Sequence, residues 1–133
     1  MASDDVKTDR RYTKDHEWAQ PHDGNVRVGI TAFAVDQLGD ITLVNLDVKA
    51  GDVLTVGKAF GTIESVKTLS DLFAPISGKV AAVNPALMDK PELVNDDCYD
   101  AAWMIELVPS DAKELEGLLD HAAYSELLKT AHH

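Results

Sequence analysis

Short apolar segments separated by turn residues run through most of the chain, and this pattern predicts a mainly β fold. Apolar positions alternate or run together, with frequent β-branched residues, in five segments that we expect to be strands: 25–30, 41–48, 59–63, 79–83 and 103–108. The stretches 51–56 and 78–83 also share the pattern G-x-V-x-x-V. Two similar strand-turn units of this kind favour a small β sandwich or flattened barrel.

Two parts of the chain have helical character instead. Between the first two strands, Thr31 can cap the beginning of a short helix, and Gly39 can end it in the left-handed conformation. Beyond about residue 110, leucines recur at helical spacing. We therefore expect one domain over residues 1–133, with a β core from about 12 to 108 and a C-terminal helical segment from about 110 to 130.

The C-terminal segment contains signals for two helices. Ser110 is the expected N-cap of the first helix, and acidic residues follow it in the first turn. Gly117 or Asp120 is expected to break the segment in two. Four leucines should pack these helices against the β core: Leu115, Leu118, Leu119 and Leu127.

Composition and charge limit the partners that this chain can bind. Its 133 residues, 45% of them hydrophobic, can fold without metals, and its one cysteine cannot form an internal disulfide. The formal net charge of −11 would repel phosphate backbones and anionic lipids, so nucleic acid and membrane surfaces are not expected partners. The first residues resemble neither a secretory signal nor a transit peptide. We expect a cytoplasmic protein, or a mitochondrial one only if this is a processed eukaryotic chain.

No catalytic or metal-binding motif stands out in the sequence. The stretch that begins at Gly51 has five residues between its glycines, where a phosphate-binding loop needs four. The histidines have no metal-ligand spacing: His16, His22, His121, His132 and His133. Acidic neighbours should raise the pKa of the Cys98 thiol, so we interpret Cys98 as a structural or incidental cysteine and not as a nucleophile. We expect no metal and no catalytic residue.

A lysine between two apolar segments is the most informative feature of the sequence. The segments 59–63 and 72–80 are expected to be strands, and the polar stretch 64–71 between them is expected to form a hairpin tip that carries Lys67. Such a lysine is usually only a solvated turn residue. An exposed, tight turn is also where a modifying enzyme can reach an amine without opening the core.

The surroundings of Lys67 resemble those of lipoyl and biotinyl carrier domains, with Gly51 16 residues before the lysine and Gly78 11 residues after it. Biotin carriers flank their lysine with methionines, where Val66 and Thr68 stand here, and 2-oxoacid dehydrogenase acyltransferases usually have an aspartate directly before it. Five stretches together cover most of the chain: YTKDHEWA (12–19), VGITAFAVDQLGDI (28–41), ESVKTLSDLFAPISGKV (64–80), NPALMDKPELVND (84–96) and LLDHAAY (118–124). Through these stretches the chain resembles the H proteins of the glycine cleavage system over nearly its whole length.

The resemblance implies a fold and a function. The fold is a lipoyl/biotinyl-carrier-like β sandwich, or barrel-sandwich hybrid, in which Lys67 carries lipoic acid as an amide. In that family the lipoyl group accepts an aminomethyl group from the P protein, gives it up to the T protein and is reoxidised by dihydrolipoamide dehydrogenase, so the carrier itself catalyses nothing. The implied attaching enzyme is a lipoate ligase or a lipoyl/octanoyl transferase, and Glu64 would help it to recognise Lys67. We expect a monomer that makes weak, charge-steered contacts.

The resemblance also implies residues that hold the lipoyl arm. Asp15, Glu17 and Asp71 match the family's docking positions, and Gln37 stands where some members have a histidine near the lipoyl ring. Carboxylates beside the aminomethyl nitrogen would keep it protonated and so slow the hydrolysis of the cargo. In a chain this acidic, most carboxylates only keep the surface solvated. As a surface acid, Glu17 should be removable by Glu17→Ala with little loss of stability.

Three alternatives remain open at this point. An H-like lipoyl carrier could serve sulfur oxidation or relay lipoate to other proteins. A plain interaction module would keep Lys67 unmodified. A small lipoyl-dependent transferase has the least support, because the motifs suggest no base, nucleophile or folate-sized pocket. The chain also departs from the family at Cys98, where proline is usual, and at Ala102, where glycine is usual, which concerns local turn geometry.

Overall fold

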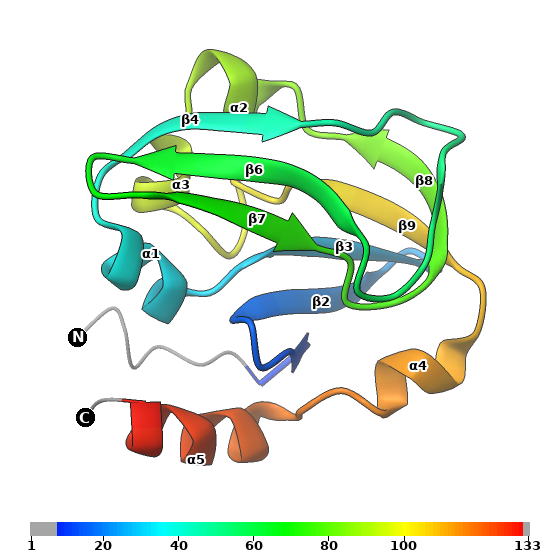
Figure 1. The fold of residues 1–133 in the computed structure, drawn as a ribbon. Coiled ribbons are helices and arrows are strands. Elements are labelled where there is room, and N and C mark those ends of the chain that lie inside the picture. Colours follow the sequence, from blue (N-terminus) through cyan, green and yellow to red (C-terminus); the bar gives the residue numbers. More distant parts are fainter. Residues whose placement is uncertain (1–7, 132–133) are drawn as a thin grey trace.

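Two antiparallel β-sheets face each other in the computed structural model, which describes residues 8–131 (Figure 1). Within these residues the larger sheet has the order β1-β2-β3-β9-β8-β5, and the smaller has the order β4-β6-β7. The strands are β1 (Arg11–Tyr12), β2 (Glu17–His22), β3 (Asn25–Ile30), β4 (Ile41–Leu46), β5 (Val53–Leu54), β6 (Ala59–Ser65), β7 (Leu69–Phe73), β8 (Gly78–Val83) and β9 (Ile105–Pro109). The mainly β sandwich that the sequence predicts is confirmed.

Short helices cover the ends of the sandwich, as the sequence predicts. They are α1 (Ala32–Leu38), α2 (Ala86–Asp89), α3 (Leu93–Asp96), α4 (Ala112–Glu116) and α5 (His121–Ala131). In Figure 1, α1 lies near the turn between β6 and β7, and α5 lies below β2, on the side of the molecule away from β4. The two G-x-V-x-x-V segments pair directly, because β5 and β8 are antiparallel neighbours.

The first helix begins and ends at the residues that the sequence predicts. Thr31 is the N-cap, and its Oγ1 accepts the N–H of Ala34 at 3.3 Å. Gly39 follows the last turn and donates its N–H to the Val35 carbonyl at 2.9 Å. Its φ of 80° is positive, as expected for a glycine in this position, but its ψ of −149° lies outside the left-handed helical region.

The hairpin around Lys67 is tighter than the sequence predicts. β6 extends to Ser65 and β7 begins at Leu69, so the tip comprises residues 66–68 and not 64–71. The expected strand over 72–80 is also wrong, because residues 74–77 carry the chain from β7 in the smaller sheet to β8 in the larger one. Pro75 lies in this connection, where a residue without an N–H suits a turn better than a ladder.

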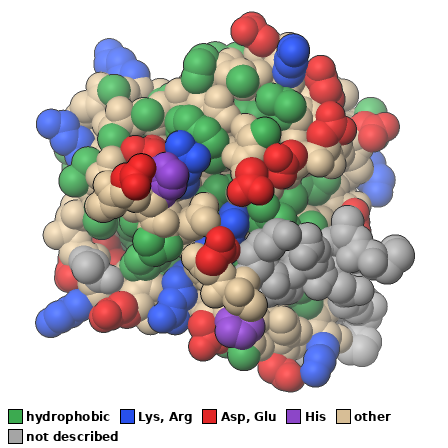
Figure 2. Space-filling view, turned by 180° about the vertical axis from the view of Figure 1, so that it is seen from behind, with side chains coloured by type: hydrophobic (Ala, Val, Ile, Leu, Met, Phe, Trp, Pro, Cys, Tyr) green, Lys and Arg blue, Asp and Glu red, His purple; other side chains and the backbone are tan. Residues whose placement is uncertain are grey.

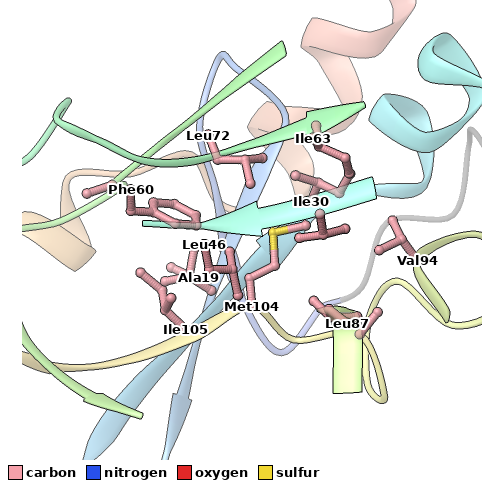
Figure 3. Packing of buried hydrophobic residues seen from close by; sticks show 14 of the residues in the cluster. Ala19, Ile30, Leu46, Phe60, Ile63, Leu72, Leu87, Val94, Met104 and Ile105 are labelled. Carbon is pink, nitrogen blue, oxygen red and sulfur yellow. The ribbon is translucent and has the colours of Figure 1, made fainter. Parts of the chain in front are cut away.

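The main hydrophobic core lies between the two sheets (Figure 3). Its labelled side chains come from both sheets, from α2 and α3 and from the segment before β9: Ala19, Ile30, Leu46, Phe60, Ile63, Leu72, Leu87, Val94, Met104 and Ile105. All of them are buried, and their apolar surface is removed from water on folding. This packing holds the β6-β7 hairpin against β2 and β3.

A second cluster, built mainly from aromatic rings, packs α5 against β1, β2 and α1. The rings of Tyr12 and Tyr124 stack 4.4 Å apart and are nearly parallel, at 7°. Trp18 lies over Gly29 of the neighbouring strand, where a β-carbon would come within 2.5 Å of the indole ring. Glycine at this position therefore makes room for a fully buried tryptophan.

The first C-terminal helix begins one residue later than the sequence predicts. Asp111 is the N-cap of α4, and its Oδ1 accepts the N–H of Lys113 at 3.0 Å. Ser110 was the expected cap, but its N–H donates to the Ser77 carbonyl at 3.0 Å and so holds this residue beside the β7-β8 connection. This backbone bond continues the pairing of β8 and β9 by one residue, so the helix begins after Asp111 instead.

The break between α4 and α5 lies where the sequence predicts it. α4 ends before Gly117, and Oδ1 of Asp120 accepts the N–H of Ala123 at 2.8 Å at the beginning of α5. The four leucines of this segment pack against the two clusters, as expected: Leu115, Leu118, Leu119 and Leu127. Two further residues of α5, Tyr124 and Leu128, are buried more deeply than any of these leucines.

The surface reflects the acidic composition of the chain. Figure 2 shows the molecule from behind the view of Figure 1, and Asp and Glu side chains gather toward the upper right of this face. Basic side chains are scattered over the same face. Within residues 8–131, no helix is long and apolar enough to cross a membrane.

Candidate functional site

Lys67 is exposed to solvent at the centre of the three-residue turn between β6 and β7. The Oγ of Ser65 accepts the N–H groups of Lys67 at 3.1 Å and of Thr68 at 3.2 Å. The Ser65 N–H donates to the Thr68 carbonyl at 2.9 Å. Ser65 thus fixes the turn from within, in the way that hydroxyl residues before turns commonly do. The sequence analysis missed this role of Ser65, although a serine directly before a turn is a local signal for it.

The end of α1 supports the turn from below. The Val66 N–H donates to the Asp40 carbonyl at 3.0 Å. A β-carbon on Gly39 would lie 3.4 Å from Cε of Lys67, so the aliphatic part of the lysine lies close to this glycine. The side-chain amide of Asn95 in α3 bonds the backbone on both sides of Asp40, at 2.8 and 3.0 Å. The backbone under Lys67 is therefore held by two helices, while its amine faces solvent.

A cavity of about 170 Å³, here called the arm cavity, opens beside the hairpin between β2, α1 and the smaller sheet. Four residues that the sequence analysis proposed for arm docking line it: Asp15, Glu17, Gln37 and Asp71. Asp15, Gln37 and Asp71 are exposed, whereas Glu17 is buried. The remaining wall is mostly apolar and comes from α1, β3, β6 and β7. The cavity thus combines an apolar wall with several acidic groups.

Glu17 connects the two sheets at the wall of the arm cavity. Its Oε2 accepts the Phe73 N–H from β7 at 2.7 Å, and its Oε1 accepts the Thr13 hydroxyl at 3.3 Å. Burial raises the pKa of the Glu17 carboxyl from 4.5 to about 8, and the nearby charge of Asp15 adds to this effect. The hydrogen bonds from Phe73 and Thr13 oppose it, because they favour the charged form.

The expectation that Glu17 is a surface acid is therefore wrong. Its side chain is only 3% exposed, and Glu17→Ala would leave the Phe73 N–H without its acceptor and open a small void. Such changes usually cost about 1–3 kcal/mol of stability for the lost hydrogen bond alone. The sequence could not reveal this, because Phe73 lies 56 residues away.

His16, which the sequence analysis considered only as a metal ligand, also lines the arm cavity. Its φ of 67° is positive, an unusual value for a residue with a side chain. The His16 N–H donates to the Thr13 carbonyl at 3.1 Å, and the His16 carbonyl accepts the Thr31 N–H at 2.9 Å. The imidazole packs against Phe33, with 4.5 Å between ring centroids. These contacts hold His16 in its strained conformation.

A chain of hydrogen bonds links His16 to α5. Nδ1 of His16 lies 2.8 Å from the Tyr124 hydroxyl, which lies 2.7 Å from Oγ1 of Thr31. Tyr124 and Thr31 are fully buried. Burial lowers the pKa of the His16 imidazole, and the carboxylate of Asp15 opposes this effect. The imidazole is therefore neutral at pH 7. Tyr124 is 108 residues from His16, so no local pattern points to this contact.

Two further residues of the sequence analysis lie apart from the arm cavity. Glu64 is half-buried on β6, directly between the exposed Leu43 of β4 and Leu69 of β7 in the strand register. Cys98 is half-buried and lines a separate cavity of about 410 Å³ between α1 and residues 95–100. This second cavity contains several aspartates but none of the residues proposed for arm docking.

The described histidines do not assemble a metal site. In residues 8–131, no group of three or more His, Cys, Asp or Glu side chains is placed to hold a metal ion. His22 lies 3.4 Å from the Asp23 carboxylate on the surface, and His121 is exposed at the beginning of α5. His132 and His133 lie outside the described residues.

Comparison with known proteins gives consistent matches over most of the chain. The family model described as "Glycine cleavage H-protein" matches residues 10–131. A "Glycine cleavage system H protein" of Myxococcus xanthus is 46% identical over 129 residues, which cover 97% of this chain and 99% of that protein. A "Probable glycine cleavage system H protein" of Natronomonas pharaonis is 53% identical over 120 residues, or 90% of this chain and 94% of that protein.

A solved structure matches the fold as well as the sequence. The crystal structure of a glycine cleavage system H protein from Mycobacterium marinum superposes with a TM-score of 0.84 at 39% sequence identity. The match covers 93% of this chain and 99% of that one.

Proposed function

The chain belongs to the glycine cleavage H-protein family, and from this premise we propose that it carries lipoic acid on Lys67 and transports the aminomethyl group of glycine between enzymes. Its partners are the P protein as donor, the T protein as acceptor and dihydrolipoamide dehydrogenase as oxidant. The chain supplies no catalytic group of its own to this sequence of reactions. When bound, the lipoyl group supplies a disulfide whose two sulfurs can accept and release the one-carbon cargo and two electrons.

The arrangement of Lys67 beside the arm cavity is the observation that carries this proposal. The attached arm has about a dozen bonds from the lysine Cα to its sulfur and spans roughly 14 Å when extended. Asp71 is four residues after Lys67, so its Cα lies at most about 14 Å from that of the lysine. The arm is therefore long enough for its sulfur end to reach the cavity. The apolar wall suits the hydrocarbon part of the arm.

The acidic residues of the arm cavity suit a cationic cargo. Asp15, Glu17 and Asp71 bring three carboxyl groups to one cavity, where the charges of Asp15 and Asp71 would favour a protonated amine. Glu17, whose pKa is raised to about 8, adds its charge once it loses its proton, and a nearby cation would favour that loss. Protonation removes the nitrogen lone pair that would otherwise expel the sulfur. Gln37 adds a neutral hydrogen-bonding group at the same cavity. These residues would hold the cargo and limit its contact with water.

Glu64 is suited to recognition by the attaching enzyme. It lies on β6, three residues before Lys67, in a strand that the turn and the end of α1 hold in place. A lipoate ligase or lipoyl/octanoyl transferase must bring its own active site to the lysine amine, so it must also contact the strand residues nearest to the turn. The carboxylate of Glu64 is the acidic group on this strand that such an enzyme would contact.

The experiment that tests the proposal is an intact mass measurement after incubation with lipoate, ATP and a lipoate ligase. The wild-type chain should gain one lipoyl group, Lys67→Arg should gain none, and the matched control Lys58→Arg, at another exposed turn, should gain one. Lipoylation that survives Lys67→Arg would contradict the proposed site.

A second measurement separates glycine cleavage from other uses of a lipoyl carrier. The lipoylated chain, mixed with P protein, should support exchange of labelled bicarbonate into the carboxyl group of glycine. A chain that is lipoylated but inactive in this exchange would be a carrier for another pathway.

A further inference from the structure

His16 is the cavity residue to which neither the sequence nor the proposed function gives a role. It lies between Asp15 and Glu17 and lines the arm cavity with them. One of its nitrogens, Nδ1, is bonded to Tyr124, and Nε2 has no hydrogen-bond partner among the described residues. A half-buried imidazole with a free nitrogen at a cavity is a candidate to bind what enters that cavity.

The buried hydroxyl groups determine which nitrogen carries the proton. Oγ1 of Thr31 already accepts the Ala34 N–H, so its own hydrogen needs an acceptor, and the Tyr124 oxygen at 2.7 Å is the acceptor within reach. The Tyr124 hydrogen is then free to point to Nδ1 of His16. With this direction, the hydroxyl hydrogens of Thr31 and Tyr124 both have an acceptor. A neutral imidazole that accepts at Nδ1 must carry its proton on Nε2.

The opposite direction would leave a buried group unsatisfied. If Nδ1 carried the proton and donated to Tyr124, the tyrosine would donate to Thr31, whose hydrogen would have no acceptor. Thr31 is fully buried, and an unsatisfied hydroxyl there would be destabilising. The geometry therefore favours Nε2–H as a hydrogen-bond donor.

We propose that Nε2–H of His16 donates a hydrogen bond to a sulfur atom of the docked lipoyl arm, and that Tyr124 of α5 is the positioning residue that keeps the proton on this nitrogen. The inference rests on the proposed function, because it needs the arm on Lys67. Sulfur is the acceptor because the arm is long enough to bring its sulfur end into the cavity that His16 lines.

The donor would favour the thiolate form of the reduced arm. The charges of Asp15 and Asp71 at the same cavity oppose a thiolate, whereas Glu17, whose pKa is raised to about 8, is mostly protonated near neutral pH. The hydroxyl of Tyr124 acts only through His16. A donor at this position offsets the effect of the charges on the sulfur. It provides a contact that an ionised carboxylate cannot make, since such a group only accepts hydrogen bonds.

The first part of the test measures the tautomer in the chain without lipoate. Nitrogen and carbon NMR shifts of the imidazole should identify Nε2–H in the wild type, and Tyr124→Phe should shift the population toward Nδ1–H. A wild-type His16 with its proton on Nδ1 would overturn the role of Tyr124. Leu128→Ala, which loosens the packing of α5 but keeps the hydrogen bonds, serves as the structural control and should keep Nε2–H.

The second part measures the reactivity of the reduced arm. In a Cys98→Ser background the arm provides the only thiols, and their alkylation by iodoacetamide is followed from pH 6 to 10. His16→Asn is the chosen substitution, because asparagine tolerates the positive φ better than other residues. It should slow alkylation near neutral pH by about tenfold, and Tyr124→Phe by about threefold, through a higher apparent pKa of the thiol.

The outcomes distinguish the inference from the function on which it rests. A pH profile that is unchanged in His16→Asn, or equally shifted by Leu128→Ala, would overturn the inference while the proposed function stands. A chain that gains no lipoyl group in the intact mass measurement would overturn the proposed function before the thiols are examined.

Discussion

Replacement of Glu17 by glutamine should change how stability depends on pH. The amide keeps the size of the side chain and can still accept the Phe73 N–H, but it cannot ionise. In the wild type, the pKa of Glu17 is raised by burial from 4.5 to about 8 in the folded state. Between these values the folded chain keeps a proton that the unfolded chain has lost. The free energy of unfolding of the wild type should therefore fall as pH rises through this range.

The magnitude follows from the two pKa values. One pKa unit corresponds to about 1.4 kcal/mol, so the wild type should lose about 3 kcal/mol relative to Glu17→Gln between pH 4 and pH 7, and about 5 kcal/mol by pH 9. Other titrating groups are common to both proteins, and their effects cancel in the difference. Urea unfolding followed by tryptophan fluorescence, at pH steps from 4 to 9, measures this difference.

A matched control is available next to Glu17 in the chain. Asp15→Asn removes an exposed carboxylate that contributes only a smaller part of the raised Glu17 pKa. Its pH profile should follow the wild type, but the fall should end at slightly lower pH and be slightly smaller, because the Glu17 pKa is raised less without the charge of Asp15. A stability difference between wild type and Glu17→Gln that stays constant within about 0.5 kcal/mol over the whole range would refute the reasoning.

Three further predictions concern other parts of the molecule. Gly29→Ala should destabilise the fold by about 1–3 kcal/mol in urea unfolding because its β-carbon would clash with the buried indole of β2, whereas Gly117→Ala, with only ordinary contacts, should stay within about 0.5 kcal/mol. Glu64→Ala should slow the lipoylation rate by several-fold, and Glu92→Ala, an exposed acid elsewhere, should not; equal rates would remove Glu64 from recognition. In the carrier loaded with aminomethyl group and kept without T protein, Glu17→Gln should release ammonia faster than the wild type above about pH 8, where Glu17 is ionised, and release should accelerate with pH in both.

The strands and α1 could be predicted from the sequence because their signals are local. Thr31 and Gly39 bound α1 as the capping preferences indicate, and the strand over 25–30 has the bounds that its alternation predicts. The hairpin tip was predicted too long, because polar residues of β7 were assigned to the turn. Their side chains face solvent or the arm cavity, so their polarity reports exposure and not the absence of a strand.

The candidate site could be predicted only in part. The resemblance supplied the four residues that line the arm cavity, but it did not reveal that one of them is buried and joins the sheets. His16, Asn95 and Tyr124 were missed because their contacts span 54 to 108 residues of sequence. A pattern of neighbouring residues carries no information about such pairs. The backbone around Lys67 depends on the Asn95 bonds nonetheless.

The bond between Glu17 and Phe73 also bears on how the molecule avoids unwanted association. β7 is the last strand of the smaller sheet, and an edge strand with free N–H groups is a template on which another chain can add a strand. The Glu17 carboxyl occupies one of these donors from the opposite sheet, and the charge of Asp71 lies on the same strand. A side chain thus takes the place of a neighbouring strand beside the hairpin that must stay open to other proteins. Without this acceptor, the N–H of Phe73 would be free to pair with a second copy of the chain. Local opening of the cavity would then expose the edge of β7 and favour aggregation.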